Sequence, residues 1–96
     1  MGDGIRLDRF LWFARICGSR ALAQAIIADG AMRIDGRHVN KPATVVRVGN
    51  VLTFAMHHDI VRVIRIEALP QRRGPAAEAR GCYTELTPID VPPPQN

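Results

Sequence analysis

Arginine side chains carry the most informative chemistry in this sequence. Twelve of the 13 basic residues are arginines, and Lys41 is the single lysine. A guanidinium is planar and donates paired hydrogen bonds that match the oxygens of a phosphate. Residues 1–54 contain eight basic and four acidic side chains, whereas residues 55–96 contain five of each. The net charge of +4 therefore lies wholly in the first half and predicts a polyanionic partner, either a nucleic acid or an anionic membrane surface.

Catalytic and metal-binding chemistry finds little support in the sequence. Ser19 has no recognisable base near it, and no pair of carboxylates is spaced for acid–base catalysis. The three histidines, His38, His57 and His58, and the two cysteines lack the spacing of zinc ligands. We therefore predict that the chain is not an enzyme and binds neither a metal ion nor a cofactor.

Length and composition predict one domain in the cytoplasm. A chain of 96 residues, of which 47% are hydrophobic, can build a single small core. The most apolar run, residues 10–16, is interrupted by Arg15 and is too short to span a bilayer, and the N-terminus lacks a secretory signal pattern, so no membrane association is expected. Cys17 and Cys82 form no CxxC motif and are expected to be free thiols.

Apolar residues at helical spacing predict two helices joined by a tight turn. The buried stripe of the first helix follows the i, i+3, i+4, i+7 pattern and consists of Leu7, Phe10, Leu11 and Ala14. Ser19 is a good N-cap for the second helix, which Gly30 ends. The buried stripe of the second helix is expected to consist of Leu22, Ala25 and Ile26.

After Gly30 the pattern alternates and predicts strands. Asp35-Gly36 is a strong hairpin signal between two short alternating segments. Further strands are expected at residues 51–54 and 60–66, the latter in the centre of the sheet. The predicted fold class is α+β: two short N-terminal helices packed on a small twisted, mainly antiparallel sheet, with a short C-terminal helical turn and an extended tail.

Four segments are expected along the chain. Residues 1–5 are predicted to form a flexible N-terminal tail, and residues 6–69 the main domain. Residues 70–87 are predicted to form a basic loop and a short helix that dock on this domain. Residues 88–96 contain four prolines and are predicted to form a proline-rich tail.

The predicted helices place polar side chains on exposed faces. Arg9 and Arg15 lie on opposite flanks of the first helix, and Arg20 and Gln24 share the solvent face of the second, opposite its apolar stripe. Ser19 begins the second helix, where unsatisfied backbone N–H groups suit a phosphate. These side chains together predict a polar, cationic surface.

Asp8 and Trp12 on the first helix each have their own interpretation. Asp8 is expected to complement the positive end of the helix dipole and to hold Arg15 or Arg9. Trp12 lies off the buried stripe and either stacks on an unpaired base or packs under the C-terminal segment. Packing is favoured, because tryptophan is usually largely buried.

Several short motifs together resemble the S-four-type RNA-binding domain, whose alpha-L motif packs two short helices on a small twisted sheet. The motifs are Arg6-Leu7-Asp8-Arg9-Phe10-Leu11, Ser19-Arg20-Ala21, the spaced residues Ile27, Gly30, Met32, Ile34 and Gly36, and Lys41-Pro42. The resemblance covers residues 5 to about 55. Within this family, residues 11–15 and 71–73 are similar to the heat shock protein 15 group.

The resemblance implies binding to structured ribosomal RNA through phosphate contacts. Carried onto this sequence, the RNA-binding face of the family consists of Arg6, Arg9, Arg15, Ser19, Arg20, Gln24, Arg33, Arg37 and Lys41. It further implies a heat-shock-type factor that acts on large ribosomal subunits carrying a stalled nascent chain with its transfer RNA. Separately from the resemblance, we expect the chain to be a monomer. Weak binding to DNA is expected as well. Two alternatives stay open: a general binder of DNA or RNA, and a non-catalytic protein-interaction module.

Overall fold

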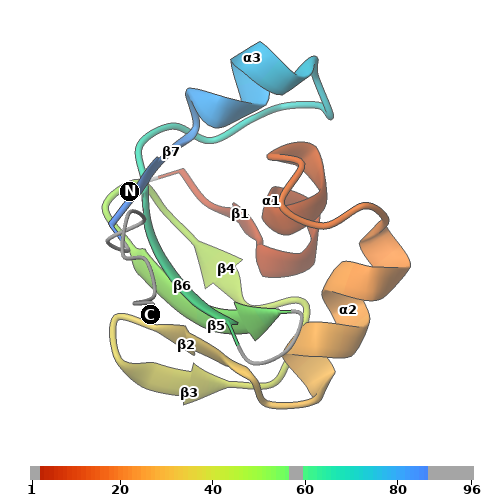
Figure 1. Ribbon diagram of the computed structural model, residues 1–96, viewed down its shortest axis with the longest axis vertical. Coiled ribbons are helices and arrows are strands. Elements are labelled where there is room, and N and C mark those ends of the chain that lie inside the picture. Colours follow the sequence, from red (N-terminus) through yellow and green to blue (C-terminus); the bar gives the residue numbers. More distant parts are fainter. Residues whose placement is uncertain (1–2, 57–59, 87–96) are drawn as a thin grey trace, which may run out of the picture.

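The computed structural model describes residues 3–56 and 60–86, which form three helices and seven strands (Figure 1). The elements follow in the order β1 (Ile5–Arg6), α1 (Leu7–Phe13), α2 (Arg20–Ala28), β2 (Met32–Ile34), β3 (Arg37–Val39), β4 (Val45–Val46), β5 (Val51–Met56), β6 (Ile60–Ile66), α3 (Ala76–Arg80) and β7 (Tyr83–Glu85). The α+β prediction is confirmed. No helix of the described residues is long and apolar enough to cross a bilayer.

The first helix forms where it was predicted but ends earlier. All four residues of its predicted stripe are buried. Ala14 is already the C-cap, and Arg15 has a φ of 61°, which lies in the left-handed region and cannot continue a right-handed helix. The placement of Arg15 on the first helix was therefore wrong: Arg15 belongs to the turn that leads to α2.

The second helix has the predicted ends but a different buried face. The Ser19 side chain accepts a hydrogen bond from the Leu22 backbone N–H at 3.0 Å, and Gly30 follows the helix with a φ of 81°. The buried residues are Ala23 and Ile27. Of the predicted stripe, Ile26 packs half-buried against the core, but Leu22 is 41% exposed and Ala25 is exposed, so the prediction was wrong for these two. The helix is apolar almost all the way round, and the apolar pattern therefore did not determine which face packs inward.

The strands form one antiparallel five-stranded sheet and a separate pair. The order in the large sheet is β3-β2-β5-β6-β7, and β1 pairs with β4 through Ile5 and Val46. The predicted hairpin joins β2 to β3, with Asp35 and Gly36 at positive φ values of 51° and 85°. The prediction of β6 as a central strand is confirmed by its pairing with both β5 and β7.

The two faces of the large sheet differ. One core cluster joins the inner face of the sheet to α1 and includes Met32, Leu52, Phe54, Ile64 and Ile66 with Leu7, Phe10 and Leu11. On the outer face, Arg33, His38 and Val61 are exposed. Because side chains alternate along a strand, the outer residues of β2 and β3 lie on the side of the sheet away from the helices.

The chain after β6 returns to α1. Figure 1 shows α3 and the loop before it at the end of the molecule where α1 lies, opposite the hairpin of β2 and β3. The predicted helical turn at residues 76–80 is confirmed as α3, and β7 then adds an edge strand to the sheet. The predicted proline-rich tail lies outside the described residues.

Candidate functional site

A buried carboxylate organises the polar surface between α1 and α2. Asp8, the second residue of α1, has a fully buried side chain. Arg6 donates to it from Nε to Oδ1 and from Nη2 to Oδ2, both at 3.1 Å. Gln24 donates from Nε2 to Oδ2 at 2.9 Å, and Arg20 donates from Nε to the same oxygen at 3.4 Å. We call these four residues the Asp8 cluster.

The Asp8 cluster carries a surplus positive charge at the surface. Burial alone would raise the pKa of Asp8, but the hydrogen bonds from Arg6 and Gln24 and the charge of Arg20 outweigh it and hold the pKa below its ordinary value. Asp8 is therefore ionised at neutral pH and balances one of the two guanidiniums. The side chains of Arg6 and Arg20 are 41% and 35% exposed, so the remaining charge faces solvent.

The different buried face of α2 explains how this cluster forms. Arg20 and Gln24 lie at helical spacing with buried Ala23 and Ile27, hence beside the packed face of α2 and not opposite it. Both side chains therefore reach Asp8 on α1. The prediction that they share one face is confirmed, whereas the prediction that Asp8 holds Arg15 or Arg9 was wrong.

A turn from later in the chain brings Lys41 to the same end of α1. The backbone N–H of Leu7 donates to the carbonyl of Thr44 at 2.7 Å, and that of Asp8 donates to the carbonyl of Pro42 at 3.2 Å. These bonds satisfy N–H groups that the first turn of a helix leaves unpaired. Within the turn, the Thr44 hydroxyl donates to the carbonyl of Lys41 at 2.7 Å. Lys41 is exposed and adds a cation beside the Asp8 cluster.

Ser19 and Arg9 lie on the two helices that carry the cluster. Ser19 precedes Arg20 directly and caps the N-terminus of α2. Arg9 follows Asp8 on α1, and its side chain is exposed. Ser19, Arg9 and Lys41 therefore lie around the Asp8 cluster.

The turn after α1 is locked to the C-terminal loop by two arginines. Arg15 donates from Nε to the carbonyl of Gly74 at 2.6 Å. In return, Arg73 donates to the carbonyls of Trp12 and Cys17, and its guanidinium lies 5.8 Å from the centre of the Trp12 ring. Sequence reasoning missed Arg73, because only the fold brings residues 72–75 against α1.

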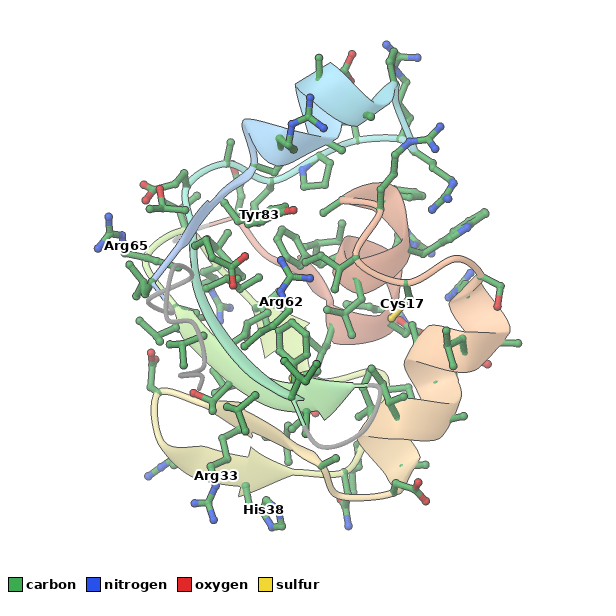
Figure 2. The ribbon with its side chains drawn as sticks, viewed as in Figure 1. Cys17, Arg33, His38, Arg62, Arg65 and Tyr83 are labelled. Atoms are coloured by element: carbon green, nitrogen blue, oxygen red, sulfur yellow. The ribbon has the colours of Figure 1, made fainter. Side chains whose placement is uncertain are left out.

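Arg33 and Arg37 lie on the sheet rather than with the helices. Arg33 points outward from β2 and donates to the carbonyl of Gly36 at 3.3 Å. Figure 2 shows Arg33 and His38 beside the hairpin, directed away from the body of the molecule. Arg37 lies on the edge strand β3 and lines a shallow groove with Arg47. The structure does not bring Arg33 together with the Asp8 cluster.

Arg62 forms a second arginine–carboxylate arrangement, in which both side chains are half-buried (Figure 2). It donates to Glu85 from Nη2 at 2.5 Å and from Nε at 3.2 Å, and this pairing raises the pKa of Arg62 above its ordinary value. Its guanidinium lies 5.7 Å from the ring centre of Phe54 and 6.0 Å from that of Tyr83. The Glu85 carboxylate balances the charge of Arg62, so we assign this pair to the stability of the sheet.

The described residues hold no recognisable catalytic or metal centre. Among residues 3–56 and 60–86, no group of three His, Cys, Asp or Glu side chains could hold a metal ion. Cys17 and Cys82 are free and buried. Burial raises the pKa of Cys17 to about 11, although the charge of Arg62 lowers it, and burial also raises the pKa of Cys82. Neither thiol is thus a nucleophile at neutral pH.

Comparisons with known proteins agree with the α+β fold. Residues 5–52 match the S4 domain family. Over 81 residues, which are 84% of this chain, the sequence is 36% identical to heat shock protein 15 of Escherichia coli K12 and 33% identical to the heat shock protein 15 homolog of Haemophilus influenzae. These alignments cover 59% and 60% of the two relatives, so the chain spans less than two thirds of their length. A trimeric structure of Vibrio cholerae heat shock protein 15 superposes with a TM-score of 0.80 and 33% identity, over 88% of this chain and 84% of that chain.

Proposed function

Because the chain belongs to the S4 domain family, and within it to the heat shock protein 15 group, we propose that it binds structured ribosomal RNA by contacting backbone phosphates. The observation that carries this proposal is the Asp8 cluster, in which one buried carboxylate holds two half-exposed guanidiniums. Asp8 fixes the positions of the Arg6 and Arg20 guanidiniums before RNA binds. These side chains therefore lose little conformational entropy when phosphates replace the counterions.

The proposed interface is centred on α1 and the start of α2. Arg6, Arg20 and Gln24 form its middle, because Asp8 holds all three in place. The N-terminus of α2 at Ser19 and three exposed cations extend the interface: Arg9, Arg15 and Lys41. Arg33 and Arg37 contribute least in this proposal, since they lie on the sheet.

We further propose that the RNA belongs to free large ribosomal subunits on which a stalled nascent chain still carries its transfer RNA. The support for this finer assignment is the similarity to heat shock protein 15 over 84% of the chain. The surplus charge of the Asp8 cluster suits folded RNA, whose shape is recognised chiefly through phosphates and sugars.

We propose that one copy of the chain is enough for binding. All residues of the Asp8 cluster come from the same chain, so a second copy is not needed to complete the site. Light scattering of the purified protein, alone and with RNA, distinguishes this monomer from a trimer such as the one described for the Vibrio cholerae relative.

Cosedimentation with separated ribosomal subunits tests the proposed function. The purified protein is mixed with small or large subunits at low and moderate salt, with duplex DNA as competitor. We expect pelleting with large subunits that weakens as salt rises, with a logarithmic slope of about −2 to −3 if three cations each contact one phosphate. Duplex DNA should not displace the protein from the large subunits. Absence from both subunits, or ready displacement by DNA, would overturn the proposal.

A further inference from the structure

Two aromatic side chains of α1 lie outside the hydrophobic core. Trp12 and Phe13 are half-buried, with ring centroids 5.6 Å apart and planes inclined at 39°. Neither belongs to the core cluster or to the half-buried side chains packed on it, whereas Phe10 and Phe54 are core residues and Tyr83 packs against them. In a chain with only 5% aromatic residues, the position of these two rings calls for a role other than filling the core.

Three arginines, Arg9, Arg15 and Arg73, lie near the two rings. Arg9 lies three residues before Trp12 and four before Phe13, which places it on the same face of α1. The guanidinium of Arg73 lies 5.8 Å from the centre of the Trp12 ring. Arg15 lies in the turn that follows, so the surface is both aromatic and positively charged.

The acidic side chains that the described contacts place near the rings, Asp8 and Glu78, are already paired. Asp8 lies four residues before Trp12 on α1 and is held by Arg6 and Arg20. The carboxylate of Glu78 lies beside Gly74, the residue that Arg15 contacts, and it accepts a hydrogen bond from Arg72 at 2.8 Å. The charge of Glu78 is therefore matched within the C-terminal segment, and the positive charge around Trp12 is retained.

This surface is held rigidly. Arg73 donates to the backbone carbonyls at both ends of the turn, those of Trp12 and Cys17, and Arg15 donates back to the carbonyl of Gly74. The loop and α1 therefore fix one another through main-chain groups. An aromatic ring and a guanidinium plane are both surfaces on which an unpaired nucleobase stacks.

We propose that Trp12, together with Phe13 and Arg73, is a stacking site for an unpaired nucleobase of the bound RNA, with Arg9 contacting the adjoining phosphate. The site is continuous with the Asp8 cluster, because Arg9 follows Asp8 on α1. This inference rests on the proposed RNA binding and adds a property of the target: the RNA presents an unpaired base next to the phosphates that the cluster contacts.

Intrinsic fluorescence tests the proposal directly, since Trp12 is the single tryptophan of the chain. Two RNA hairpins are compared that differ only by one bulged adenosine in the stem. We expect the bulged hairpin to bind about five-fold more tightly or better, and to quench the Trp12 emission more strongly at saturation than the paired hairpin. Equal affinity and equal quenching would overturn the stacking site while leaving RNA binding intact. If neither hairpin binds, the proposed function itself fails.

Variants at the ring and at two neighbouring arginines sharpen the test. Trp12→Leu should lower the affinity for the bulged hairpin to that for the paired one and leave the latter unchanged, and Trp12→Phe should restore part of the preference. Arg73→Ala should also weaken the preference, whereas Arg72→Ala, which removes a 66% exposed side chain paired with Glu78, should not. Equal loss of both affinities in Trp12→Leu would assign Trp12 to packing under the C-terminal segment. Because the fluorescence comparison uses the unaltered protein, it decides the matter even if a variant fails to fold.

Discussion

The Asp8 cluster and the Arg62–Glu85 pair use the same two side-chain chemistries with different results. Glu85 meets one guanidinium with both oxygens, between the rings of Phe54 and Tyr83. Asp8 instead receives two guanidiniums and an amide. The pair is neutral, whereas the cluster keeps a positive charge that faces solvent. The number of guanidiniums that share one carboxylate therefore decides how much positive charge is left for an anionic partner.

The largest effect that we expect concerns the neutral pair. Arg62→Ala should lower the free energy of unfolding by about 3 kcal/mol, because two charge-assisted hydrogen bonds and the contacts with two rings are lost from a half-buried site. The affinity for RNA should be unchanged. Urea unfolding measures the stability. Arg65→Ala on the same strand is the control, since its exposed pair with Glu67 should contribute less than about 0.5 kcal/mol. Similar losses in both variants would contradict the assignment of Arg62 to stability.

The next effect concerns the carboxylate of the cluster. Asp8→Ala should lower the free energy of unfolding by about 2 kcal/mol, because the hydrogen bonds from Arg6, Arg20 and Gln24 are lost while both guanidiniums can still be solvated. Asp29→Ala, at the exposed end of α2, is the control and should change stability by less than about 0.5 kcal/mol.

Acidification should also remove the stabilisation that the ionised Asp8 carboxylate provides. The pKa of Asp8 is lower in the folded protein than its ordinary value of 3.8, so its stabilisation is fully present above pH 3.8 and is lost as the pH falls through the lower folded value. The difference in unfolding free energy between the original protein and Asp8→Ala, measured in urea at a series of pH values, should shrink over that range. A difference that does not depend on pH there would show that packing, and not the ionised carboxylate, is what Asp8 contributes.

A smaller effect, on affinity alone, should follow from charge reversal in the cluster. Arg20→Glu should weaken RNA binding about ten-fold, or about 1.4 kcal/mol, because a phosphate contact is replaced by repulsion. Arg80→Glu on α3 makes the same change in net charge and should reduce affinity less than about three-fold. Filter binding gives both affinities. Equal losses would mean that net charge, and not the Asp8 cluster, controls binding, and an unchanged affinity in Arg20→Glu would remove α2 from the interface.

The smallest effect is expected on the outer face of the sheet. Arg33→Ala should change RNA affinity less than about two-fold, because Arg33 lies on the face turned away from the helices and its contact is with Gly36 of its own hairpin. The same binding assay measures it. A loss of RNA affinity as large as that of Arg20→Glu would mean that the interface extends around the edge of the sheet to its outer face.

The turns and caps of this fold are readable from sequence because their signals are local. Ser19 caps α2, Gly30 ends it, and Asp35-Gly36 closes the hairpin, each as predicted. These residues act on backbone within a few positions of themselves. The fold class could therefore be predicted before any long-range contact was known.

The inward face of α2 could not be predicted in the same way. Apolar residues surround the helix almost completely, so several stripes fit the periodicity equally well. Packing against α1 buries Ala23 and Ile27, and this choice turns Arg20 and Gln24 toward Asp8. The sharing of one helix face by Arg20 and Gln24 was thus predictable, but the carboxylate that joins them was not.

The contacts of Arg73 and Arg62 depend on tertiary structure. Arg73 meets Trp12 and Cys17 across more than fifty residues of chain. For Arg62 a signal was present, because it shares its strand parity with Ile64 and Ile66, which face the core. An arginine at an inward strand position indicates a buried partner, and β7 supplies it as Glu85.

The hydrogen bonds at the start of α1 set an order of events in folding. α1 has seven residues, and isolated helices shorter than about 12 to 15 residues are marginal in water. Its first N–H groups bond to the carbonyls of Pro42 and Thr44, and Ile5 pairs with Val46. The helix is therefore stabilised only after a long loop has closed. During synthesis, the nascent chain cannot display the assembled Asp8 cluster until the residues through Val46 have emerged, so Arg6 and Arg20 leave the ribosome before the structure that holds them in place is complete.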